Sequence, residues 1–136
     1  MALEVDDIDA ALEFYGEFLE FTLRGRSKAS AFIDLGDQFI ALSSKRHQEP
    51  DMDRHLGLVV DDRDAVKRSL EEMGVALLPG RGADFLDPWG NRIQIVEYAN
   101  IQFSKTADVL RGMGLDGLEK TPEAIQELAK KGMAPE

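Results

Sequence analysis

The chain has 136 residues, which is enough for one ordinary domain with a short addition. It contains no cysteine, so disulfide scaffolds, thiol nucleophiles and cysteine-based zinc sites are excluded, and no apolar run reaches the ~20 residues that span a bilayer. Its 16 basic and 26 acidic residues give a formal net charge of −10, which repels nucleic acid. We therefore expect a cytoplasmic protein whose partners include neither nucleic acid nor membranes.

An internal repeat organises the first two thirds of the chain. The pattern Val-Asp-Asp-x-Asp-Ala begins at Val5 and again at Val60, and each copy follows a short apolar stretch that predicts a strand. Each copy then leads into an amphipathic helix, which Asp7 can cap in the first copy and Gly74 can end in the second. The apolar stripes of the two helices are Ile8, Ala11, Leu12, Tyr15, Phe18 and Leu19, and then Val66, Leu70 and Met73.

Three short strands are predicted after each helix, with turn residues between them. They cover residues 21–26, 31–35 and 38–43 in the first copy, and residues 75–78, 83–86 and 92–98 in the second. The predicted fold class is therefore α+β, with tandem βαβββ modules that form a curved mixed sheet around a cleft. The domain would span residues 1–98, as module one (1–44), a connector (45–54) and module two (55–98).

Neighbouring residues of a strand point to opposite faces of the sheet, which predicts the surroundings of each side chain. Ile40, Leu42, Ile93 and Ile95 are expected to pack under the helices. The alternate positions are expected to line the ligand-binding cleft, and these residues are Glu4, Phe39, Ala41, His55, Arg92 and Gln94.

Residues 99–136 lie outside the repeat and predict a helical extension. Ser104 can cap a first helix that stops at Gly112 or Gly114, and Thr121 can cap a second that begins at Pro122. The apolar stripe of the second helix would consist of Ile125, Leu128 and Ala129. The sequence is compatible with three docking sites for this extension: the outer helices, a partner subunit, and the mouth of the cleft.

The repeat, the Phe14-Tyr15 pair and the run Phe-Leu-Asp-Pro-Trp-Gly-Asn-Arg-Ile-Gln-Ile at residues 85–95 resemble the vicinal oxygen chelate superfamily. That superfamily includes glyoxalase I, bleomycin resistance proteins and extradiol dioxygenases. The resemblance covers residues 1–98, and the Asp-Pro-x-Gly-Asn turn is its most specific part. It implies paired modules, a homodimer, and a divalent metal ion in the cleft held by the first and last strand of each module.

When the metal-ligand positions of the superfamily are matched to this sequence one by one, most of them lack a side chain that binds metal. The first position precedes Met1, the second falls on Ala41, the third on His55 and the fourth on Gln94. A methyl group cannot coordinate a metal, and a catalytic zinc normally needs three protein ligands. We therefore expect neither a metal site nor any other cofactor. Two alternatives stay open: Glu4 could join His55 at an ion, or a start upstream of Met1 could restore the first ligand.

Two functions remain compatible with this sequence. The first is a metal-independent protein that binds and sequesters a small molecule, which the net charge of −10 would favour if the molecule is a cation. The second is a glyoxalase-like lyase, isomerase or epimerase that uses His55 as an acid or base, with a weakly bound Zn, Ni, Mn or Fe ion. Glyoxalase I itself is not expected, because Glu4 replaces the arginine that pairs with glutathione in that enzyme.

Overall fold

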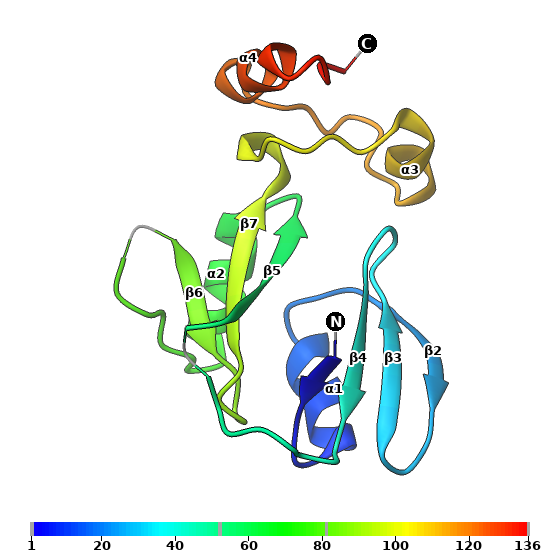
Figure 1. The fold of residues 1–136 in the computed structure, drawn as a ribbon, viewed down its shortest axis with the longest axis vertical. Coiled ribbons are helices and arrows are strands. Elements are labelled where there is room, and N and C mark those ends of the chain that lie inside the picture. The colour runs from blue at the N-terminus through cyan, green and yellow to red at the C-terminus, as the bar shows by residue number, and fades with distance from the viewer. Residues whose placement is uncertain (1, 52, 81, 136) are drawn as a thin grey trace.

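The computed structural model describes residues 2–51, 53–80 and 82–135. Module one forms a four-stranded sheet in the order β1-β4-β3-β2, in which β1 runs parallel to β4 and the other pairs are antiparallel. One helix, α1, lies beside this sheet (Figure 1). The elements of this module are β1 (Ala2–Glu4), α1 (Ile8–Gly16), β2 (Thr22–Arg26), β3 (Ser30–Asp34) and β4 (Phe39–Ser43).

Module two forms a three-stranded sheet in the order β5-β7-β6, with β5 parallel to β7 and β6 antiparallel to it. Its elements are β5 (His55–Val60), α2 (Arg63–Glu72), β6 (Ala83–Leu86) and β7 (Arg92–Glu97). The α+β class with two related mixed sheets is confirmed. The strand predicted over residues 75–78 is wrong, although Leu78 N donates to Asp84 O at 2.7 Å. Pro79 and Gly80 follow at once, and a proline cannot extend a ladder of hydrogen bonds.

The repeated aspartates start both helices in the same way. The side chain of Asp7 accepts a hydrogen bond from Ala10 N, and that of Asp62 accepts one from Ala65 N, each at 3.0 Å. Gly74 follows α2 with a φ of 76°, a left-handed conformation that glycine adopts without steric cost. Both predicted helix signals are therefore confirmed.

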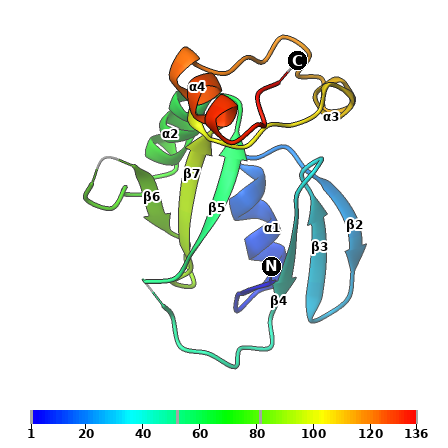
Figure 2. The ribbon, with the colours of Figure 1, turned by 45° about the horizontal axis from the view of Figure 1, so that its top comes forward.

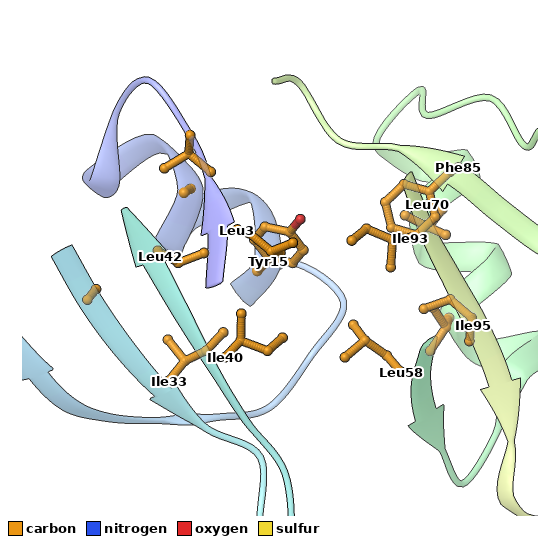
Figure 3. Packing of buried hydrophobic residues seen from close by; sticks show 14 of the residues in the cluster. Leu3, Tyr15, Ile33, Ile40, Leu42, Leu58, Leu70, Phe85, Ile93 and Ile95 are labelled. Atoms are coloured by element: carbon orange, nitrogen blue, oxygen red, sulfur yellow. The ribbon is translucent and has the colours of Figure 1, made fainter. Parts of the chain in front are cut away.

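One hydrophobic core joins the two modules. Ile40, Leu42, Ile93 and Ile95 are each at most 2% exposed, which confirms the predicted buried face of each sheet. Figure 3 shows side chains of the first sheet, such as Ile40, and of the second, such as Leu58, meeting in the space between the sheets. The buried faces of both sheets therefore look toward a shared interior, and their other faces look away from it.

Helix α1 belongs to module one but packs on module two as well. The Phe14 ring lies 6.4 Å from Trp89 and 6.2 Å from Phe85, and the Phe18 ring lies 5.6 Å from Phe85. The Tyr15 hydroxyl donates a buried 2.7 Å hydrogen bond to Asp87 in the β6–β7 turn. Burial, together with the Asp87 charge, raises the pKa of Tyr15 well above its ordinary value.

Asp87 holds the β6–β7 turn together. One of its carboxylate oxygens accepts from Trp89 N at 3.0 Å and from Asn91 N at 2.8 Å. The other accepts from Tyr15 and from the Asn91 side chain, which also donates to Glu4 O at 2.8 Å. The Asp-Pro-x-Gly-Asn motif therefore connects its own turn to both α1 and β1.

The C-terminal extension contains η1 (Tyr98–Asn100), α3 (Ala107–Gly112) and α4 (Pro122–Lys130). The predicted Ser104 cap is wrong: Thr106 caps α3, because Lys105 N donates to the Tyr98 hydroxyl and holds this segment outside the helix. Thr121 and Pro122 begin α4 as predicted. The buried stripe of α4 is Ala124 and Leu128, whereas Ile125 is 39% exposed and Ala129 is exposed. These two buried residues are four positions apart, so they lie on the same face of α4, and that face packs against the rest of the protein.

The extension runs from the end of β7 to the β3–β4 turn of module one (Figures 1 and 2). Near β7, Lys120 Nζ donates to Tyr98 O at 2.8 Å and lies 3.8 Å from the centre of the Tyr98 ring. At the β3–β4 turn, Lys105 Nζ pairs with the Asp37 carboxylate at 2.5 Å, and Met113 packs against Gly36. The extension therefore connects the ends of the two modules. Within the described residues, no helix is long and apolar enough to cross a membrane.

Candidate functional site

The open face of the first sheet exposes large apolar side chains, together with Asp34 and its ion-pair partner Arg24. Phe39 and Ala41 alternate with the buried Ile40, and Phe32 lies opposite Ala41 in the β3–β4 register. Phe39 is 64% exposed and Phe32 is 45% exposed. A groove of about 410 Å³ lies at these two rings, and Gly25 on β2 lines it too. Large apolar side chains at such exposure are typical of a binding surface.

The open face of the second sheet is polar. The β5–β7 register places His55 beside Arg92, and Gln94 lies one pleat further along the same face. Arg92 donates to Asp84 from Nε at 3.0 Å and from Nη2 at 2.7 Å, and Asp84 is only 7% exposed. The sequence reasoning missed Asp84, although strand alternation puts it on the same face as Arg92 and Gln94. This face therefore offers an imidazole, an amide and a paired guanidinium.

Glu4 has a different role from the one predicted from its position. Its two carboxylate oxygens accept hydrogen bonds from His47 N and Gln48 N, each at 3.0 Å. These amides, Gln48 first, lower the pKa of Glu4 below its ordinary value. Arg46 adds a hydrogen bond from Nη2 to Glu4 O at 3.4 Å and another to Trp89 O at 2.8 Å. Glu4 therefore fixes the connector between the modules.

The six predicted residues thus divide between two surfaces. Phe39 and Ala41 lie on the open face of the first sheet, and His55, Arg92 and Gln94 lie on that of the second. Both faces point away from the shared core, because the alternate residues of the same strands fill that core. These five residues therefore lie on two separate faces of the chain, and Glu4 borders the connector between the modules.

The residues at the metal-ligand positions of the superfamily do not fit a divalent ion. Ala41 offers a methyl group and Gln94 a neutral amide, which leaves the His55 imidazole as the one strong donor of the three. The first position precedes Met1, which itself lies outside the described residues. Both oxygens of Glu4 already accept hydrogen bonds from backbone amides. Residues 2–51, 53–80 and 82–135 contain no group of three or more histidine, aspartate or glutamate side chains placed to hold a metal.

Comparison with known proteins agrees with this architecture. The family model of the Glyoxalase/Bleomycin resistance protein/Dioxygenase superfamily matches residues 1–95. A glyoxalase family protein from Bacillus anthracis is 23% identical, with a TM-score of 0.60 over 71% of this chain and 88% of its own. Lactoylglutathione lyase from Agrobacterium tumefaciens is 21% identical, with a TM-score of 0.58 over 72% of this chain and 90% of its own. No curated protein matches the sequence. Because these sequence identities are low, the structural matches show that the chain shares the fold of these proteins and nothing more.

Proposed function

Because the chain belongs to the glyoxalase/bleomycin resistance protein/dioxygenase superfamily, we propose that it binds and sequesters a small molecule without a metal ion. The main support for this proposal is the set of side chains at the metal-ligand positions of the superfamily. Ala41 replaces a carboxylate ligand, Gln94 replaces another, and the Glu4 oxygens are occupied by the connector amides. The protein would act in the cytoplasm, whose reducing conditions do not affect a chain that has no cysteine and therefore no disulfide.

The two open faces suit a ligand with a ring and a polar group. Phe32 and Phe39 offer aromatic surface on one face, and His55 and Gln94 offer hydrogen-bonding groups on the other. The net charge of −10 favours a cationic ligand over an anionic one at long range. Arg92 contributes no net positive charge, because the Asp84 carboxylate neutralises it.

The proposal includes a homodimer, in which the open face of module one on one protomer covers that of module two on its partner. A second copy is the occupant we propose, because its module two supplies a polar sheet face and each protomer carries both faces. Burial of Phe32 and Phe39 in this way would remove exposed apolar surface from water. The cleft predicted from the sequence would then form between two chains.

Phe39→Glu should convert the dimer to a monomer, because a carboxylate in an apolar interface costs several times the thermal energy. Phe103→Glu is the matched control, since Phe103 is 71% exposed and lies in the C-terminal extension. Sedimentation velocity at several protein concentrations measures the mass of each variant. A wild-type chain that sediments as a monomer at every concentration contradicts the homodimer.

The binding function is tested by thermal shift of the wild-type protein against a panel of small aromatic amines, with and without EDTA. We expect the compounds that raise the melting temperature to do so equally in both conditions, and to be recovered chemically unchanged by mass spectrometry. Phe39→Glu should lose these shifts and Phe103→Glu should keep them. Shifts that vanish with EDTA, or a recovered compound of altered mass, contradict metal-free sequestration.

A further inference from the structure

A second cavity lies between the two modules, and at the β3–β4 turn it shares Asp34, Gly36 and Gln38 with the groove on the open face of the first sheet. Its volume is about 690 Å³, which lies within the range of small-molecule pockets. The segment after α1, the β3–β4 turn, and the region where β5 leads into α2 form three of its walls. The C-terminal extension forms the fourth through Lys105, Met113, Leu115 and Leu118. None of the six residues predicted to bind ligand lines this cavity, which we call the tail pocket.

Apolar side chains make up much of the tail pocket. Two of them, Leu58 and Val66, belong to the shared core and are 1% and 7% exposed, so this part of the wall is fixed by core packing. Others come from the segment after α1 and from the extension. The apolar lining residues include Phe18, Leu19, Phe21, Leu35, Leu58, Val60, Val66, Met113, Leu115 and Leu118.

The charged residues of the tail pocket are mostly acidic. Among the residues that the structure describes, four carboxylate residues line the pocket, and the one lining cation, Lys105, is already paired with Asp37 at 2.5 Å. Arg24 pairs with Asp34 at 3.4 Å, but no ion pair reaches the other three carboxylates within the described part of the chain. These three are Glu20, Asp61 and Asp62. The pocket therefore repels an anion and attracts a cation.

We propose that the tail pocket binds an organic cation with a bulky apolar body. The apolar walls supply the area that such a body would bury, and the surrounding carboxylates compensate its charge. This site does not depend on the open faces or on a second protomer. It therefore adds a binding activity to the function proposed above.

The test uses two probes of nearly the same shape and opposite charge, tetraphenylphosphonium and tetraphenylborate. Each is titrated by calorimetry into the 136-residue protein. The cation should bind saturably and the anion should not. Ala65→Phe fills the pocket from α2 and should weaken cation binding by about tenfold or more, because an added ring takes up ligand space. Ala10→Phe is the matched control: Ala10 is the equivalent residue of α1, also donates to a capping aspartate, and is exposed.

A charge variant tests the pocket without adding bulk. Asp61→Asn should weaken binding of tetraphenylphosphonium by about threefold, whereas Asp64→Asn, an equal charge change on α2 outside the lining, should have a smaller effect. The proposal is overturned if the anion binds as well as the cation, or if a folded Ala65→Phe protein keeps wild-type affinity.

Discussion

Replacing Asp87 with alanine should destabilise the protein by on the order of 3 kcal/mol, because several donors would lose a charged acceptor at once. The Asp87 carboxylate accepts from Tyr15, Trp89 and Asn91, and the residue is only 4% exposed. A buried donor without a partner costs about 1–3 kcal/mol. Urea unfolding followed by circular dichroism measures the loss of unfolding free energy.

Tyr15→Phe is the companion variant to Asp87→Ala. It removes one hydrogen bond to the carboxylate and leaves the turn intact, so it should cost about 1–2 kcal/mol. An Asp87→Ala loss no larger than the Tyr15→Phe loss would contradict the role of Asp87 in the turn. It would mean that water replaces the carboxylate as the acceptor for Trp89 and Asn91.

Phe85→Ala should cost about 3–5 kcal/mol, the usual range for deletion of a buried phenylalanine ring. Phe85 is fully buried on β6 and contacts both Phe14 and Phe18 of α1, so its loss opens a cavity where the two modules meet. Phe103→Ala is the matched control and should change the unfolding free energy by less than about 0.5 kcal/mol, because Phe103 is 71% exposed. The same urea titration measures both variants.

A Phe85→Ala loss near that of Phe103→Ala would contradict a single core shared by the two modules. The expected loss should also appear in one cooperative transition that unfolds both modules together. Because Phe85 and Asp87 act at the same contact with α1, the double variant should lose less than the sum of the single losses.

Local signals predicted most of the fold. Asp7 caps α1 and Gly74 follows α2 as predicted, and the alternation of Ile93 and Ile95 with polar residues assigned the buried face of β7 correctly. Errors arose where a contact between distant residues outweighed the local signal. Lys105 is held by Tyr98 and Asp37, which moves the start of α3 from Ser104 to Thr106.

The candidate site was less predictable than the fold. Strand alternation predicts the sheet face on which a residue lies, but not which other segment packs on that face. The hydrogen bonds from the connector amides to Glu4 could therefore not be predicted. Likewise, Phe18 was predicted to lie on the apolar stripe of α1, but its contact with Phe85 of module two was not predicted. Phe14, which also contacts Phe85, was not part of that predicted stripe. The walls of the tail pocket come from segments that are far apart in the sequence, so no local sequence pattern predicts it.

The metal content of the purified protein tests whether this member of the superfamily binds its ligand without a metal ion. Elemental analysis should find no stoichiometric divalent ion, and zinc, nickel, manganese, iron and cobalt salts should not raise the melting temperature. An ion at 100 times its Kd would add about 2.7 kcal/mol of stability, so a functional site would be detected. A stoichiometric ion, or a saturable shift that His55→Ala abolishes, would contradict the account and indicate a metal-dependent enzyme.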